Sequence, residues 1–143
     1  MRSRLYARLL PAAHTLVYRL TSGRIGGRWG STRVLLLTTT GRRTGRRHTT
    51  PLLYIEDAGK YVAAATNDGA TRHPGWYRNL MTRPEAMVQA GADKFAVEAT
   101  TATPEERDRL WPLLADSYAN YERDRKRTTR EIPVVILAPR GEQ

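Results

Sequence analysis

Apolar residues recur at helical spacing near the start of the chain, with arginines between them. This period predicts an amphipathic helix that is kinked or begun afresh at Pro11, because proline removes a helix hydrogen bond. The segment 21–31 that follows holds four glycines, which predicts a loop or linker. The apolar positions of the predicted helix are Leu5, Leu9, Ala13, Leu16, Val17 and Leu20.

From residue 34 onward the pattern changes to short β-type runs separated by turn residues. Pro51 lies inside the second run and indicates an edge strand or a bulge, since proline cannot donate to a sheet. Strands that do not alternate regularly with helices favour an α+β fold, an antiparallel barrel with peripheral helices. The six predicted strands cover residues 34–40, 47–55, 61–66, 85–90, 94–101 and 132–138.

Two further helices are predicted between these strands. Thr103 can cap a helix, Pro104 suits its first turn and Glu106 completes a capping box, so a helix should run from there to about Tyr118. A shorter helix opens at Pro74 and should run through Leu80.

The length of 143 residues suits a single domain, with the helix and linker in residues 1–30 and the barrel in residues 31–143. The absence of cysteine excludes disulfides and thiol chemistry, so any redox activity requires a borrowed cofactor. No apolar run approaches the roughly 20 residues of a transmembrane helix. We also expect no signal peptide, because Pro11 and His14 interrupt the first apolar stretch.

Positive charge is concentrated in the first third of the chain. Residues 1–55 contain eleven arginines and no acidic residue, whereas the remainder is nearly neutral. The partner of this segment should therefore be anionic, and a phosphate ligand, a nucleic acid and an acidic membrane are all open.

Residues 41–50 form the densest cluster of candidate chemistry, Gly-Arg-Arg-Thr-Gly-Arg-Arg-His-Thr-Thr. Arginine forks and threonine hydroxyls are the donors that phosphates and carboxylates bind, and the two glycines frame a turn. The spacing is not that of a P-loop. The cluster predicts an anion site, and the alternatives are a solvated basic hairpin or a nucleic-acid patch.

Two aromatic clusters are further candidates. Residues 73–80 place Trp76 and Tyr77 beside a glycine at a helix start, which suits either a flat ligand or ordinary core packing. Tyr118 and Tyr121 precede the polar run 122–130 and indicate either a shared pocket or a surface loop.

Metal binding is not expected from this sequence. His14, His48 and His73 lie far apart and lack the usual ligand spacing. The chain also contains neither a Gly-x-Ser-x-Gly nor a Gly-x-Gly-x-x-Gly motif, which argues against an esterase nucleophile and a Rossmann nucleotide site.

Taken together, these motifs resemble the deazaflavin-dependent nitroreductases, also called coenzyme F420-dependent quinone reductases. The resemblance spans roughly residues 16–139. It rests on the order and spacing of four segments: residues 35–45, Thr49–Leu52, His73–Leu80 and Arg130–Pro133.

The resemblance implies a split β-barrel of the FMN-binding type and hydride transfer from the reduced deazaflavin. It implies that Thr66, Tyr118 and Tyr121 meet the substrate, with Tyr121 also against the cofactor. The cofactor-binding residues it implies are Arg42, Arg43, Thr44 and His48 for the phosphate and acidic tail, and Thr49, Thr50, Pro51, Leu52, Leu53, Ala64, Ala65, Thr66, Asn67, Gly75, Trp76, Tyr77, Arg78 and Asn79 around the ring.

The chain departs from the family pattern at three positions. His48 stands where members often have arginine, and Asn67 stands where some have lysine. Asp124 aligns with a third tyrosine of the members that activate nitroimidazoles. The last departure argues against activation of nitro prodrugs but not against cofactor binding.

The resulting hypothesis is an F420-dependent oxidoreductase that reduces a quinone-like or nitro-type acceptor. One alternative is a split-barrel protein that binds F420, a lipid or a tetrapyrrole without turnover. A second is a basic nucleic-acid-binding module, which is disfavoured because aromatics do not alternate with the arginines.

The amino-terminal helix either covers the barrel or rests on an anionic membrane. We therefore expect a cytoplasmic protein, either free or peripheral on the inner face of the plasma membrane. A homodimer is also open.

Overall fold

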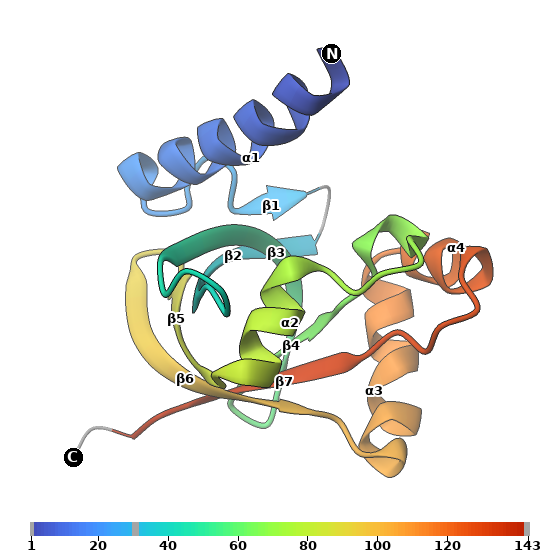
Figure 1. The fold of residues 1–143 in the computed structure, drawn as a ribbon. Coiled ribbons are helices and arrows are strands. Elements are labelled where there is room, and N and C mark those ends of the chain that lie inside the picture. Colours follow the sequence, from blue (N-terminus) through green and yellow to red (C-terminus); the bar gives the residue numbers. More distant parts are fainter. Residues whose placement is uncertain (1, 30–31, 142–143) are drawn as a thin grey trace.

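The computed structural model describes residues 2–29 and 32–141, and the side chains of residues 2–11 and of Trp29 lie outside that description. A closed antiparallel barrel of six strands forms its centre (Figure 1). Around the barrel the order is β2 (Thr32–Thr40), β3 (Arg47–Asp57), β4 (Lys60–Ala64), β7 (Val134–Pro139), β6 (Asp93–Thr101) and β5 (Glu85–Ala90), with β5 pairing back onto β2. The predicted split-barrel fold is confirmed.

Alternation of side chains along the strands divides the core into an inner and an outer part. Leu35 and Leu37 of β2 are fully buried inside the barrel. Val34 and Leu36 point to the outer face, where Tyr18 of the amino-terminal helix covers them. Because both faces of β2 are covered, almost all of this strand is apolar, as the sequence shows.

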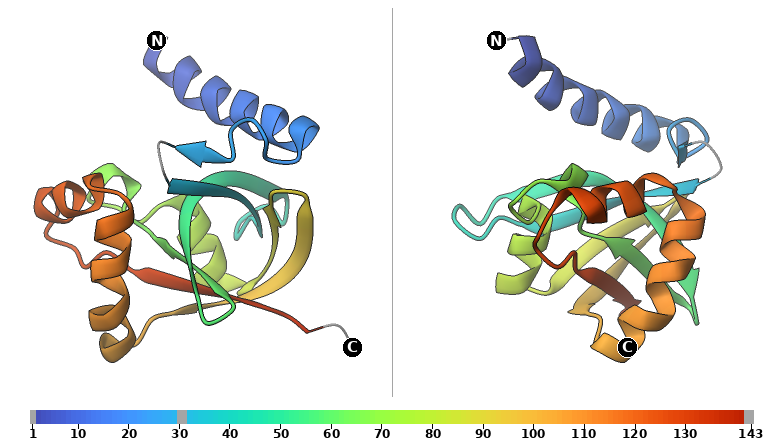
Figure 2. Two further views of the ribbon diagram at one scale, coloured as in Figure 1. Left: turned by 180° about the vertical axis from the view of Figure 1, so that it is seen from behind. Right: turned by 90° about the vertical axis from the view of Figure 1, so that its right-hand side faces the viewer.

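In the part of the chain that the structure describes, four α-helices lie around the barrel (Figure 2). Helix α1 (Arg2–Thr21) lies across the end formed by β1 (Arg28–Trp29) and β2. The other three are α2 (Gly75–Thr82), α3 (Pro104–Ser117) and α4 (Asn120–Arg127). Helices α3 and α4 stand together on one side and pack on the outer faces of β4 and β7.

Tyr18 fixes α1 to the barrel. Its side chain is 1% exposed, and its hydroxyl accepts a hydrogen bond from the Gly91 N–H at 2.7 Å. Arg19, beside it, donates to the Thr49 hydroxyl at 3.0 Å. Helix α1 therefore packs on the barrel, while Leu16 and Leu20 remain exposed. Within the described residues, no helix combines the length and apolarity needed to cross a membrane.

The structure differs from the sequence-based expectation at two helices. Helix α1 does not begin afresh at Pro11 but continues unbroken from Arg2 to Thr21, because one proline removes only one hydrogen bond. The polar run after Tyr118 is not a loop, since residues 120–127 form α4. The segment expected as a linker also contains the short strand β1.

Pro51 lies on the part of β3 that is separated from β4. Residues 47–54 pair with β2 in a regular register, whereas only residues 55–57 pair with β4. Pro51 therefore lies on an edge, one of the two predicted placements, and not in a bulge. Strands β3 and β4 separate beyond this point, which leaves the edge of β3 available to other groups.

Candidate functional site

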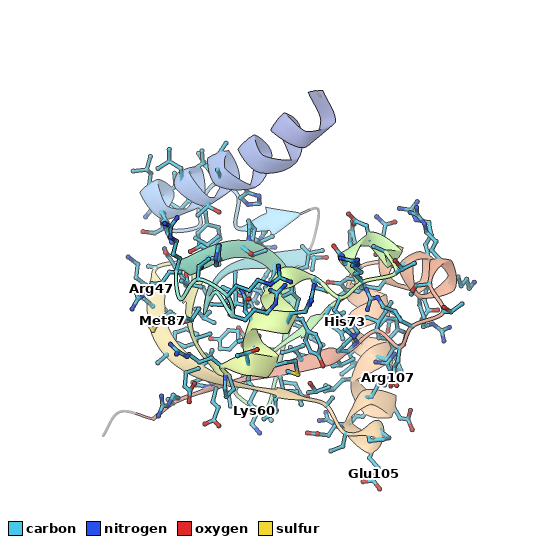
Figure 3. All side chains as sticks on the ribbon, viewed as in Figure 1. Arg47, Lys60, His73, Met87, Glu105 and Arg107 are labelled. Carbon is cyan, nitrogen blue, oxygen red and sulfur yellow. The ribbon has the colours of Figure 1, made fainter. Side chains whose placement is uncertain are left out.

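A cavity of about 910 Å³ lies where β3 and β4 separate. This volume suits a cofactor-sized ligand. Side chains reach it from the β2–β3 turn, β3, the segment after β4, α2 and α4. Arg47 at the start of β3 and His73 in the loop before α2 are labelled in Figure 3, and each directly precedes a residue that lines the cavity.

The β2–β3 turn supplies the basic end of this cavity. Arg42, Arg43, Thr44 and His48 line it, and the last three are exposed at its mouth. A Cβ atom at Gly41 would lie 2.8 Å from His48 Nε2 and 2.9 Å from Thr44 Oγ1. A larger residue at this position would displace the ends of these two side chains from the mouth of the cavity.

Arg42 is held in place by Asn79 of α2. The Asn79 Oδ1 atom accepts hydrogen bonds from the Arg42 backbone N–H at 3.2 Å and from its guanidinium at 3.0 Å. Asn79 is 5% exposed, and its Nδ2 donates to Thr39 at 3.0 Å. Partial desolvation, followed by the charges of Arg78 and Arg43, lowers the pKa of Arg42. This accumulation of like charge would be relieved by a bound anion.

The middle of the cavity is mostly apolar. Thr50, Pro51, Leu52 and Leu53 line it in succession, although alternate side chains of a strand point to opposite faces. The unpaired backbone edge of β3 must therefore itself face the cavity, where its free polar groups can bind a ligand. Ala64, Gly75 and Trp76 complete this part.

The third part of the cavity carries hydroxyl and carboxyl groups. Thr66, Tyr118, Tyr121 and Asp124 line it. The Tyr118 hydroxyl accepts a hydrogen bond from Asn120 Nδ2 at 2.7 Å, which leaves its own proton available for a ligand. The two tyrosine rings meet edge to face with centroids 5.1 Å apart. Burial raises the pKa of Tyr121 far above the usual value, so this phenol is a neutral donor.

Arg130 holds the segment after β4 in place from the far end of the sequence. Its guanidinium donates to the carbonyl oxygens of Ala65, Thr66 and Ala70, at 2.6 Å for Thr66. It also lies 3.0 Å from His73 Nδ1. Burial, then the charges of Arg130 and Arg78, lowers the pKa of His73, which keeps the ring neutral and able to accept this contact.

Gly69 seats α4 against the 3₁₀ turn η1 (Asn67–Gly69). Its φ is +75°, and a Cβ there would lie 2.9 Å from both the Asp124 carbonyl oxygen and Arg127 Cβ. We expect Gly69→Ala to lower the free energy of unfolding by about 2 kcal/mol, through backbone strain and displacement of α4. Urea denaturation measures this loss.

The matched control is Gly59→Ala. Gly59 has a similar φ of +78° but no atom within 4 Å of the added Cβ. The free energy of unfolding of this variant should fall by about 1 kcal/mol, through backbone strain alone. Equal losses in the two variants would show that α4 is not seated by Gly69.

Most of the residues implied by the resemblance line this one cavity. Those that do so are Arg42, Arg43, Thr44, His48, Thr50, Pro51, Leu52, Leu53, Ala64, Thr66, Asn67, Gly75, Trp76, Asn79, Tyr118 and Tyr121.

Thr49, Ala65, Tyr77 and Arg78 are absent from the cavity wall. Thr49 faces α1, where it contacts Arg19. Ala65 is fully buried in the core, and the Tyr77 hydroxyl pairs with Thr101 at 3.0 Å. The charge of Arg78 acts on both Arg42 and His73 and lowers the pKa of each. A binding role for these residues stays a prediction.

Five further wall residues were not named as expected contacts, although Gly41 and Pro74 belong to the candidate clusters 41–50 and 73–80, and Asp124 to a departure from the family pattern. Thr39, Gly41, Asp68, Pro74 and Asp124 also line the cavity. Arg130 acts behind the wall, and the sequence indicated it only through the Arg130–Pro133 segment of the resemblance. Among residues 2–29 and 32–141, no three His, Cys, Asp or Glu side chains gather into a possible metal site.

Known proteins are similar to this chain in both sequence and fold. Residues 11–139 match the family described as F420H(2)-dependent quinone reductase. An F420H(2)-dependent quinone reductase of Mycobacterium tuberculosis (strain H37Rv) is 41% identical over 131 residues, which are 89% of this chain and 88% of that protein. A solved F420-H2 dependent reductase is 35% identical with a TM-score of 0.67, over 73% of this chain and 92% of that chain. A second solved chain, described as a domain-swapped dimer, is 32% identical with a TM-score of 0.70, over 88% and 96% of the two chains.

Proposed function

Because the chain belongs to the F420H(2)-dependent quinone reductase family, we propose that it reduces a quinone with reduced coenzyme F420 in the cavity between β3 and β4. The observation that carries this proposal is the division of one cavity into a basic, an apolar and a hydroxyl-bearing part. A single small ligand of one polarity would not need all three.

The donors of the cavity fit F420. Arg42, Arg43 and Thr44 match its phosphate and acidic tail. The flat deazaflavin ring matches the apolar middle between the β3 edge and Trp76. The start of α2 at Gly75 adds backbone N–H groups on the same side.

The reduced cofactor supplies the hydride, and the protein supplies orientation and hydrogen bonds. Thr66, Tyr118 and Tyr121 would donate to the acceptor oxygens, which gain negative charge during reduction. Such donors stabilise the transition state more than the ground state. The same donors would serve the oxygens of a nitro group, so the choice of a quinone as acceptor rests on the family to which the chain belongs.

Helix α1 supports a second element of the proposal, contact with an anionic membrane where lipid-soluble quinones are found. Leu16, Leu20 and Ile25 are 58%, 76% and 61% exposed on its outer surface and the following loop. Arg19 and Arg24 lie beside them. We propose a cytoplasmic protein that touches the inner face of the membrane through this surface. Flotation with anionic liposomes tests this contact, and light scattering tests for a homodimer.

The central test is to titrate the purified protein with F420 in both redox states and then supply a quinone. We expect tight binding and steady oxidation of the reduced cofactor. NADPH alone should give no turnover, because the anion turn lies between antiparallel strands and not at a strand–helix junction. Binding without turnover would favour the non-catalytic alternative. DNA binding that competes with F420 would favour the nucleic-acid alternative.

A further inference from the structure

An acidic pair lines the hydroxyl-bearing part of the cavity. Asp124 of α4 and Asp68 of η1 both contribute to its wall. Asp124 is only 5% exposed. It follows Tyr121 by three positions on α4, so the two side chains occupy the same face of this helix.

These acids are separated from the arginine turn. The β2–β3 turn lies on one side of α2, and α4 with η1 lies on the other (Figures 1 and 2). The cavity therefore has arginines at one end and carboxyl groups at the other, with the apolar slot between them. A ligand that fills it encounters opposite fields at its two ends.

The position of Asp124 is fixed by the backbone around it. The close approach of Gly69 to the Asp124 carbonyl and Cα holds α4 against η1. Burial first, then the charge of Asp68, raises the pKa of Asp124, while Arg123, Arg127 and the Thr66 side chain act in the opposite direction. Tyr121 is the remaining titratable group that interacts with it.

We propose that Asp124 sets the charge preference of the acceptor, so that cationic and neutral quinones are favoured over anionic ones. The inference rests on the proposed function, since it concerns the acceptor end of the same cavity. A carboxylate at the wall attracts a cationic substituent on the quinone and repels an anionic one. A unit charge about 8 Å away, at an effective dielectric constant of about 20, changes a binding constant about 30-fold.

The test uses three naphthoquinones that differ in one substituent: none, a trimethylammonium group or a sulfonate. Parent and Asp124→Asn are compared at about pH 8, well above the ordinary range of a carboxyl group. Binding is measured by quenching of tryptophan fluorescence, with and without oxidised F420, because Trp76 lines the cavity. Turnover with reduced F420 is measured separately. Each value is divided by that for the uncharged quinone, which removes general effects of the substitution.

In Asp124→Asn we expect the relative affinity for the sulfonate to rise about 10- to 30-fold and that for the cation to fall by a similar factor. The matched control is Asp116→Asn, which removes an exposed carboxylate outside the cavity and should leave both ratios unchanged. Asp124→Glu retains the charge and should retain the preference of the parent.

Unchanged ratios in Asp124→Asn would overturn the inference while leaving the proposed function intact. Altered binding ratios without any turnover by the parent would support the inference and refute the proposed function. If Asp124→Asn does not fold, Asp124→Ser takes the same test, since it also removes the charge. Equal ratios for that variant and the parent would again overturn the inference.

Discussion

Arg42→Ala is expected to weaken the binding of F420 by about 10- to 150-fold. Arg42 lines the cavity and is the arginine of the turn that Asn79 fixes with two hydrogen bonds. A guanidinium that is already oriented loses little conformational freedom when it binds a phosphate or carboxylate. Fluorescence titration with oxidised F420 measures the change. In the parent this affinity should also fall as salt is added.

The turn itself provides a matched control. Arg46 belongs to the same turn but is exposed and does not line the cavity. Arg46→Ala removes the same formal charge without removing a side chain from the cavity wall. Its effect on F420 affinity therefore measures only the long-range electrostatic contribution of one arginine of the turn. We expect that variant to lose less than about 3-fold in affinity. Equal affinities for the two variants would refute a specific anion contact at Arg42.

The elements that were predictable from the sequence carry local signals. The capping box at Thr103 and Glu106 is present as predicted, with both reciprocal hydrogen bonds. The strand at residues 85–90 has the predicted bounds. The family resemblance was specific enough to predict both the barrel and the F420-dependent family, and both predictions are confirmed.

The parts that were missed depend on distant contacts. Helix α4 is highly polar and buries only Tyr121 and Asp124, so its sequence shows no apolar period. The hydrogen bonds of the Arg130 guanidinium join residues that are 57 to 65 positions apart, such as Thr66 at 64. Asp68 reaches the cavity only because η1 and α4 pack together. No local sequence pattern predicts such long-range contacts.

Tyr121→Phe is expected to slow quinone reduction by about 10- to 100-fold, which is about 1.4–2.7 kcal/mol of barrier. Tyr121 is 5% exposed and lines the hydroxyl-bearing part of the cavity. Its hydrogen bond to the acceptor oxygen strengthens as negative charge builds on that oxygen, so it stabilises the transition state more than the ground state. The loss should therefore appear in kcat, with little change in the affinity for F420.

The burial of Tyr121 also predicts how the effect of this substitution depends on pH. Burial raises the pKa of Tyr121 well above the usual phenol range, so the hydroxyl keeps its proton throughout an ordinary assay. The effect of Tyr121→Phe should then be the same from about pH 6 to about pH 9. A defect that grew or vanished over this range would assign the lost step to a different, titrating group.

Phenylalanine retains the ring and its edge-to-face contact with Tyr118, so the fold should survive, as a thermal melt can verify. Tyr61→Phe is the matched control, because Tyr61 belongs to β4 and packs on Tyr54 and Phe95 away from the cavity wall. It should reduce quinones at the rate of the parent. If Tyr121→Phe also does so with a panel of quinones, Tyr121 is only a wall of the pocket. If instead F420 affinity falls while kcat holds, the hydroxyl binds the cofactor, and the donor to the acceptor must be sought at Thr66 or Tyr118, the other hydroxyls in that part of the cavity.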